Sequence, residues 1–116
     1  ELNKKGDGNM EEKKDIDIIK NVKIVEWLKS ELLTAVASLF AILTKGVQNT
    51  KEDILDIISN IILVTYLLGK RLGLSYGSIN LKIQSKIKLG LLEENKLEKW
   101  FGDLSDLQEF FNGNKE

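Results

Sequence analysis

Two aspartates and an asparagine stand at helical spacing near the middle of the sequence. Asp53, Asp56 and Asn60 are separated by three and four residues, and at about 100° per residue these offsets bring them to one side of a helix. Carboxylate and amide oxygens are ligands that suit a hard cation such as Mg²⁺, which would bind a substrate's phosphates and activate a water molecule. Acids in a first helical turn also oppose the helix dipole, so from the pattern alone a plain helix start is the preferred interpretation.

Glu31 is the second acid with a suggestive environment. It stands in the apolar segment 28–43, where Lys29 is the only other charged residue. A carboxylate in such surroundings is rarely buried without a partner. We expect it either to face a partner or to lie at a solvated edge beside Glu26 and Lys29, and the sequence favours neither.

Residues 70–92 contain five basic side chains and no acid: Lys70, Arg71, Lys82, Lys86 and Lys88. A guanidinium group matches phosphate oxygens in a two-pronged geometry, so Arg71 is the best candidate to hold a triphosphate, with Lys70 beside it. A solvated helix face is the alternative, and for the three later lysines it is the preferred interpretation.

Composition limits the chemistry that these groups can support. A chain of 116 residues, with 42% hydrophobic and 30% charged residues, is typical of one globular domain. Seventeen basic residues nearly balance eighteen acidic ones, which argues against a nucleic-acid partner. Cysteine and histidine are absent, which excludes thiol and imidazole metal ligands and histidine-activated nucleophiles and fits a cytoplasmic location. Catalysis would have to use carboxylates, amines, hydroxyls and a hard metal ion.

The apolar spacing predicts an all-α bundle of four to five helices. We expect a disordered arm over 1–14, a helical domain over 15–112 and a disordered tail over 113–116. A short helix over 16–22 should lead, directly or through a break, into a long helix that ends near Gly46, followed by a polar connection and a cap at Thr50. Further helices are expected over 51–72, stopping at Gly73, over about 78–89, capped at Gly90, and over about 93–111, with an interruption at Gly102.

The helix expected over 51–72 is apolar on nearly all sides. Such a helix must be covered by its own chain and by a second subunit, which predicts an oligomer. Its most apolar stretch, 54–68, is shorter than the roughly 20 residues that a membrane-spanning helix needs, so no membrane partner is expected. In the last helix, an apolar stripe is expected down one side: Leu97, Trp100, Phe101, Leu104, Leu107, Phe110 and Phe111.

Three segments together resemble the MazG-like family of all-α nucleoside triphosphate pyrophosphohydrolases. They are EWLKSELLTAVASLF from Glu26, DILDIISNIILVTYLLGKRLGLSY from Asp53 and KLEKWFGDLSDL from Lys96. The resemblance spans about 15–111. It implies a helical fold that pairs into homodimers or dimers of dimers, and magnesium-dependent hydrolysis of a nucleoside triphosphate to a monophosphate and pyrophosphate.

The family's two acidic motifs can be carried over residue by residue. Its ExxD pattern falls on Asp53 and Asp56, and its EExxE pattern falls on Ser30, Glu31 and Thr34, where one acid of three remains. The resemblance therefore implies that Glu31, Asp53 and Asp56 hold a single Mg²⁺ and carry catalysis. Lys70, Arg71 and Asn60 would bind substrate. The alternative is a non-catalytic dimeric module that kept the fold and binds nucleotides or partners.

Overall fold

The computed structural model describes residues 2–45, 51–93 and 96–113, which form helices and no strand. The helices are α1 (Leu2–Lys45), α2 (Lys51–Arg71), α3 (Tyr76–Leu92), α4 (Lys96–Phe101) and α5 (Asp103–Phe111). The all-α prediction is thus confirmed. The chain divides into two compact units, residues 1–74 and 75–116, which are called here the hairpin unit and the C-terminal unit.

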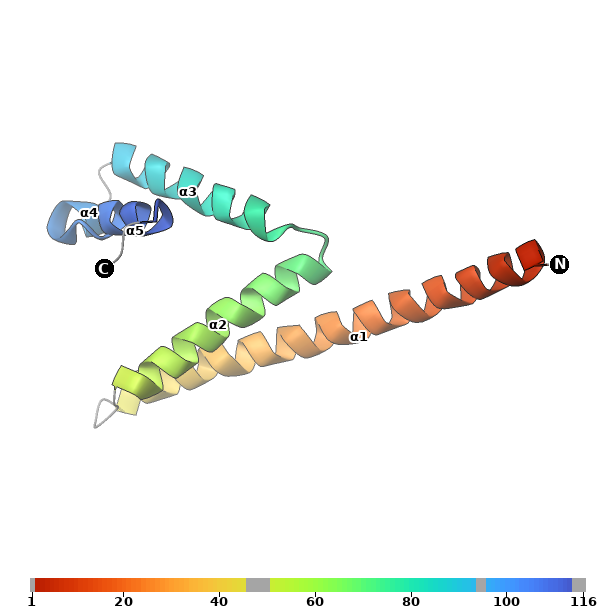
Figure 1. Cartoon of the computed structure of the whole chain (residues 1–116). Coiled ribbons are helices and arrows are strands. Elements are labelled where there is room, and N and C mark those ends of the chain that lie inside the picture. Colours follow the sequence, from red (N-terminus) through yellow and green to blue (C-terminus); the bar gives the residue numbers. More distant parts are fainter. Residues whose placement is uncertain (1, 46–50, 94–95, 114–116) are drawn as a thin grey trace. The chain divides into compact units, whose positions relative to one another are not determined.

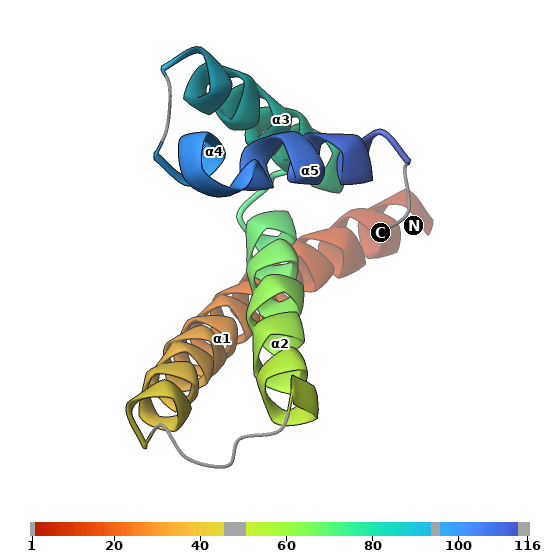
Figure 2. The same cartoon turned by 90° about the vertical axis from the view of Figure 1, so that its left-hand side faces the viewer.

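The hairpin unit consists of α1 and α2, which lie side by side in opposite directions (Figures 1 and 2). The side-chain amide of Asn21 donates to the backbone carbonyl of Arg71 over 3.3 Å, which fixes the register at one end. Seven residues further along α1 and seven back along α2, the register brings Leu28 level with Val64, and both are buried, at 2% and 5% exposure. This seven-residue repeat is the spacing of a coiled-coil seam.

The end of α2 follows the sequence prediction closely. Gly73 has a positive φ of 94°, a backbone conformation that glycine adopts without steric cost. The N–H of Gly73 donates to the carbonyl of Lys70, and the N–H of Leu74 donates to that of Gly69. These two bonds form a Schellman motif, which satisfies carbonyls that the end of the helix would otherwise leave free.

The start of α1 differs from the prediction. One continuous helix begins at Leu2, runs through residues 2–14 of the segment expected to be a disordered arm, and continues through 22–24 without a break. The physical reason is that no proline interrupts the segment and that its lysines and glutamates are good helix formers. Residues 11–20 are all exposed, so this part of α1 is not held by packing. The caps expected at Gly46 and Thr50 lie outside the described residues.

In the C-terminal unit, Ser75 caps the start of α3, and its hydroxyl accepts a hydrogen bond from the N–H of Ser78 at 3.0 Å. The helix then runs to Leu92, so the prediction that it stops at Leu89 with a cap at Gly90 is wrong. Gly90 lies inside α3, where a Cβ would stand 2.8 Å from Cδ1 of Leu104. The glycine therefore serves the close approach of α5 to α3 and not a helix end.

The interruption expected at Gly102 is confirmed, with a positive φ of 69° between α4 and α5. The Glu98 carboxylate accepts the backbone N–H of Ser105 at 3.0 Å and a short hydrogen bond from the Ser105 hydroxyl. The single apolar stripe expected across this region is not formed, because α4 and α5 are separate helices. Leu104 and Phe111 are half-buried, whereas Trp100 and Phe101 are 68% and 66% exposed.

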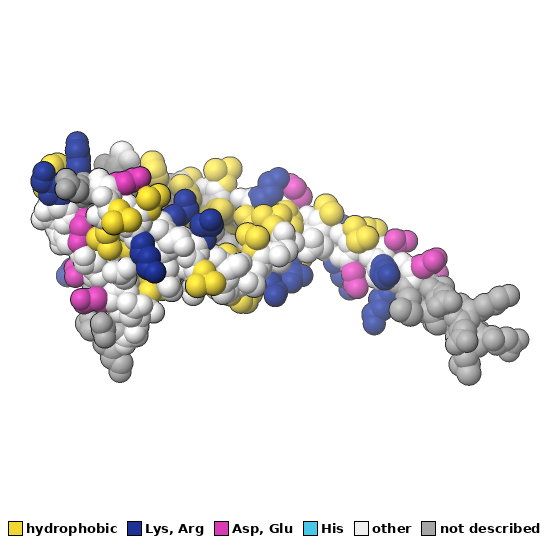
Figure 3. All heavy atoms as spheres, turned by 90° about the horizontal axis from the view of Figure 1, so that it is seen from above, with side chains coloured by type: hydrophobic (Ala, Val, Ile, Leu, Met, Phe, Trp, Pro, Cys, Tyr) yellow, Lys and Arg dark blue, Asp and Glu magenta, His cyan; other side chains and the backbone are white. Residues whose placement is uncertain are grey.

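Many large apolar side chains lie at the surface, and Figure 3 shows them interspersed with charged groups. Among the described residues, the segment Glu11–Thr44 of α1 is long enough to cross a membrane and contains an 18-residue stretch with a mean hydropathy of 1.4. α2 and α3 pass the same test only when counted together. Core helices of soluble proteins also meet it, so this observation alone places nothing in a membrane. In α2 only Val64 and Gly69 are buried, and its cover by a second subunit stays a prediction.

Candidate functional site

A hollow of about 120 Å³ opens along one edge of the seam between α1 and α2. It is lined from α1 by Glu31, Thr34, Ala35 and Ser38, and from α2 by Asp56, Ile57 and Asn60. Offsets of three, four and seven residues place the α1 members on one side of their helix, and offsets of one and four do the same on α2. Ala35 is buried at 6% exposure, and its small side chain leaves the space that a larger residue of the seam would fill.

The polar groups of this hollow are oxygen donors of the kind that Mg²⁺ binds. Two carboxylates, two hydroxyls and one amide line it, and hard divalent cations prefer such ligands. Within the part of the chain that the structure describes, neither Glu31 nor Asp56 has a hydrogen-bond or ion-pair partner. The donor set therefore fits a hard cation by its chemistry, and the two acids are available to one.

Asp53 does not line the hollow, although it precedes Asp56 by a single helical turn. Across the described ranges, no group of three or more acidic side chains is spaced to hold one metal ion. Asp53 is not without an interaction of its own. The structure thus brings together Glu31 and Asp56 of the three predicted ligands, and a contribution from Asp53 stays a prediction.

Of the three predicted substrate-binding residues, the structure likewise places only some at the hollow. Asn60 lines the hollow. Lys70 and Arg71 lie at the other end of α2, at least ten residues further along, which is about 15 Å on the helix axis. In one chain they do not reach the hollow, so their proposed role needs a second chain or a long substrate.

The hydroxyl side chains of α1 differ in whether they line the hollow. Thr34 lines it and Ser30 does not, so the two hydroxyl residues onto which the sequence resemblance carries acidic motif positions are not equivalent. Ser38 was missed by sequence reasoning, although its spacing was visible, since it follows Thr34 by four residues and Glu31 by seven. An extra hydroxyl on the acidic side of a helix was the signal that could have identified it.

No curated protein and no solved structure matches the chain. The family model of the MazG-like family matches residues 18–104. This range includes every residue that lines the hollow, all of α2 and α3, and the helix break at Gly102. Because the match covers well over half of the sequence, the chain belongs to the MazG-like family.

Proposed function

We propose that this protein is a magnesium-dependent nucleotide pyrophosphohydrolase that cleaves a nucleoside triphosphate to a monophosphate and pyrophosphate. The observation that carries the proposal is that Glu31 of α1 and Asp56 of α2 line the same hollow. Both residues lie within the range that the family model matches. An acid in a first helical turn needs no ligand to explain it. Two acids from different helices that share a hollow without an ion-pair partner are better explained by a cation.

The roles of the side chains follow from their chemistry. Glu31 and Asp56 would hold one Mg²⁺, with oxygens of Thr34, Ser38 and Asn60 completing or orienting its shell. The ion would supply positive charge to the substrate's phosphate oxygens. A carboxylate of the hollow would accept the proton of a water molecule while the water oxygen bonds to phosphorus and the bond to pyrophosphate breaks.

The proposal includes a homodimer or a dimer of dimers. The developing negative charge on the phosphates needs cationic groups, and the two cations predicted to bind substrate, Lys70 and Arg71, are about 15 Å along α2 from Asn60. A second subunit that lays its own α2 beside the hollow would bring them closer. The exposed apolar residues Leu55, Ile62 and Leu63, at 57%, 52% and 56% exposure, are suitable contacts for that subunit.

A second candidate function is a nucleotide-binding module without turnover. It is favoured by the loss of charge at the motif: two carboxylates line the hollow, while Thr34 offers a hydroxyl there. Each missing carboxylate weakens the attraction for Mg²⁺. Such a protein would bind a magnesium–triphosphate complex and release no pyrophosphate.

Titration calorimetry with Mg²⁺, in the absence and presence of a non-hydrolysable nucleoside triphosphate, tests the proposal together with an assay for pyrophosphate release. We expect metal-dependent nucleotide binding that Asp56→Ala or Glu31→Gln weakens at least about tenfold, or ~1.4 kcal/mol. Glu26→Gln is the matched control, because Glu26 lies exposed on α1 and pairs with Lys29 at 2.9 Å.

The outcomes separate the two candidate functions. Binding with pyrophosphate release supports the enzyme. Binding that depends on Asp56 without any release supports the non-catalytic module. The absence of metal-dependent binding, or an equal loss in Glu26→Gln, would contradict both.

A further inference from the structure

The edge of the hairpin unit that carries the hollow continues along α1 beyond it. Residues seven apart occupy equivalent positions in the seven-residue repeat of the seam, and Trp27 stands seven residues before Thr34. Ile24 likewise stands seven before Glu31, and both Thr34 and Glu31 line the hollow. Trp27 is 57% exposed, and its ring has no aromatic or hydrogen-bonding partner among the described residues. An exposed aromatic ring therefore follows the acidic groups on the same edge, about 6 Å from Glu31 along the helix axis.

Two cations stand at the far end of this edge, one on each helix. Lys20 precedes Trp27 by a further seven residues, and Arg71 follows Ile57, which lines the hollow, by fourteen. The hydrogen bond of 3.3 Å from the side-chain amide of Asn21 to the carbonyl of Arg71 brings the two positions to one level. Both side chains are exposed, and neither has an ion-pair partner in the part of the chain that the structure describes.

The edge thus presents carboxylates, an aromatic ring and cations in that order. Lys20 lies eleven residues from Glu31 on α1, and Arg71 lies eleven from Asn60 on α2, which is about 16 Å along each helix axis. Between these ends, Leu67 of α2 stands seven residues after Asn60 and is 38% exposed. A ligand that matches the whole edge has an anionic end that binds a metal ion, a flat apolar middle and a second anionic group.

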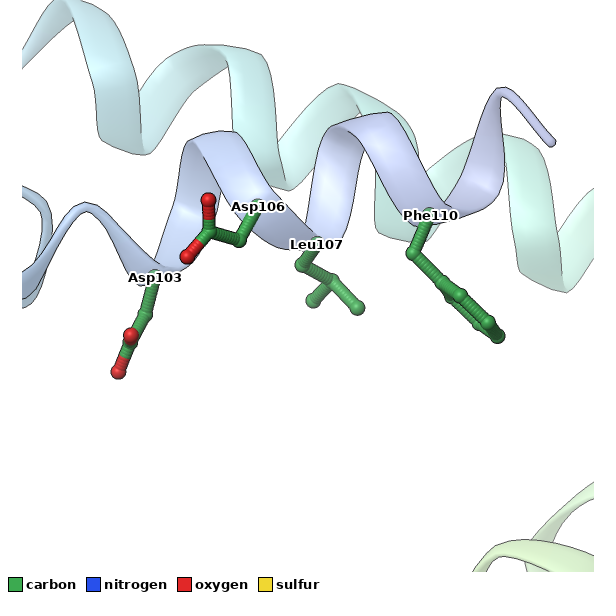
Figure 4. Close-up of a pocket in the computed structure, with 4 residues that line it drawn as sticks. All are labelled: Asp103, Asp106, Leu107 and Phe110. Atoms are coloured by element: carbon green, nitrogen blue, oxygen red, sulfur yellow. The ribbon is translucent and has the colours of Figure 1, made fainter. Parts of the chain in front are cut away.

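The hollow on α5 lacks this order, although it also has an exposed aromatic side chain. Asp103, Asp106, Leu107 and Phe110 line it, and in Figure 4 Asp103, Leu107 and Phe110 point away from the ribbon of α3 behind them. Phe110 is 57% exposed, like Trp27, but the described residues that line this hollow include two carboxylates and no cation. A phosphorylated ligand is repelled there, so Phe110 is a matched control for Trp27.

We propose that the hollow between α1 and α2 takes a nucleoside triphosphate that carries a further phosphate group on the far side of its base. The base stacks on Trp27, since every base has a face that an exposed aromatic ring can cover. Lys20 and Arg71 bind the second phosphate. This rests on the proposed function, because the triphosphate end is bound at the hollow. Arg71 then serves the substrate of its own chain, which leaves Lys70 as the cation that a second subunit would bring.

A plain nucleoside triphosphate matches only part of the edge. Its base follows the triphosphate after a single sugar, so the base reaches Trp27 and no group remains for Lys20, about 10 Å further along α1. A nucleic-acid strand is too long an anion for this edge. Asp17 stands one turn beyond Lys20 and seven residues before Ile24, so a carboxylate ends the cationic stretch and a single further phosphate fits it best.

Calorimetric titration with two probes and Mg²⁺ tests the second phosphate site. One probe is α,β-methylene ATP, whose α–β linkage is not hydrolysed, and the other is the same nucleotide with a phosphate on a short alkyl chain at the adenine amino group. We expect the extended probe to bind at least about tenfold tighter, because hydrogen bonds between charged groups are strong. Lys20→Gln should bring this affinity ratio toward one. Lys29→Gln should preserve it, since Lys29 lies nine residues away, about 180° around α1.

Tryptophan fluorescence tests the stacking. The chain has two tryptophans, so in a Trp100→Phe background Trp27 alone reports, and both probes should quench its emission. Trp27→Ala should weaken the binding of both probes about fivefold or more, whereas Phe110→Ala should bind them as the native chain does. Trp27→Phe keeps a ring and should recover most of the affinity.

The results separate a failure of the second phosphate site from a failure of the proposed function. If neither probe binds with Mg²⁺, the proposed function fails, and the second site fails with it. Equal affinities for the two probes, or a ratio that Lys20→Gln leaves as it is in the native chain, would overturn the second phosphate site while the proposed function stands. Unchanged emission of Trp27, or an equal loss of affinity in Phe110→Ala, would overturn the stacking of the base.

Discussion

Each unit of the chain has a carboxylate near hydroxyl side chains, but only the carboxylate of the C-terminal unit is hydrogen-bonded to one. In the C-terminal unit, Glu98 accepts two hydrogen bonds from Ser105 and ties α4 to the first turn of α5. In the hairpin unit, Glu31 lines a hollow with Thr34 and Ser38, and no partner for it is found among the described residues. The comparison teaches that an acid with local donors has a structural role, whereas an acid facing a hollow is available to a ligand.

Truncation of one buried residue in each unit should have the largest effect and tests whether the two units unfold independently. Leu28 and Ile87 are 2% and 3% exposed, one in each unit. Truncating either to alanine removes buried apolar contacts and leaves a cavity, which should cost about 2–5 kcal/mol. Hydrogen exchange followed by mass spectrometry should show faster exchange in α1 and α2 for Leu28→Ala, and in α3 and α5 for Ile87→Ala.

Leu33→Ala is the control for these truncations, because Leu33 is 73% exposed and its loss should cost much less. If Leu28→Ala accelerates exchange equally in all five helices, the two units unfold as one and their comparison as separate structures fails.

A third carboxylate in the hollow tests whether Glu31, unlike the hydrogen-bonded Glu98, is available to a metal ion. Thr34 lines the hollow and Ser30 does not, and the sequence resemblance predicts that the family motif has acids at both positions. Thr34→Glu should raise the affinity for Mg²⁺ about tenfold, or ~1.4 kcal/mol, because a third carboxylate would join Glu31 and Asp56. Calorimetric titration with Mg²⁺ measures this change.

Ser30→Glu is the matched control, since it adds the same charge to the same helix outside the hollow. A general electrostatic effect would raise the Mg²⁺ affinity equally in both variants, and that result would remove the support for the hollow as the metal site. A gain confined to Ser30→Glu would place the site elsewhere on α1.

Much of the fold could be predicted because its signals are local. Gly73 and Gly102 need positive φ, so a glycine between periodic apolar segments marks a break in the helix. Gly90 gave the same signal for a different reason, a close approach by Leu104, which depends on packing that the sequence does not display. The start of α1 was misplaced because a charged segment without proline is compatible with either a helix or a disordered arm.

The sequence predicted which residues of the candidate site lie on one face of a helix, but not which of them line the hollow. Spacing alone put Asp53 beside Asp56 and Asn60, but the hollow takes Asp56 and Asn60 and leaves Asp53 out. That outcome depends on the register of α2 against α1, which is set by residues distant in sequence, such as Asn21 and Arg71. Pairing between Glu98 and Ser105 was likewise not predicted, because it depends on how the helix break at Gly102 places the first turn of α5 beside Glu98.

The smallest expected effect is a change in the pKa of Glu98, the hydrogen-bonded carboxylate of the C-terminal unit. Hydrogen bonds from the Ser105 hydroxyl and then from its backbone N–H hold the pKa of Glu98 below its ordinary value of 4.5. A lowered folded-state pKa means that this carboxylate contributes stability above the unfolded pKa and loses it as the pH falls through the folded pKa. Acidification below pH 4.5 should therefore loosen the start of α5, and Ser105→Ala should raise the pKa of Glu98 toward 4.5.

Carbon-detected NMR titration of the Glu98 carboxyl measures both effects, together with amide exchange at Ser105. Ser85→Ala is the control, because the Ser85 hydroxyl bonds to the carbonyl of Leu81 within α3 and does not touch Glu98. If Glu98 titrates at the same pH in Ser105→Ala as in the native chain, its hydrogen bonds do not favour the charged form. Glu98 would then cease to be the paired acid against which Glu31 stands out.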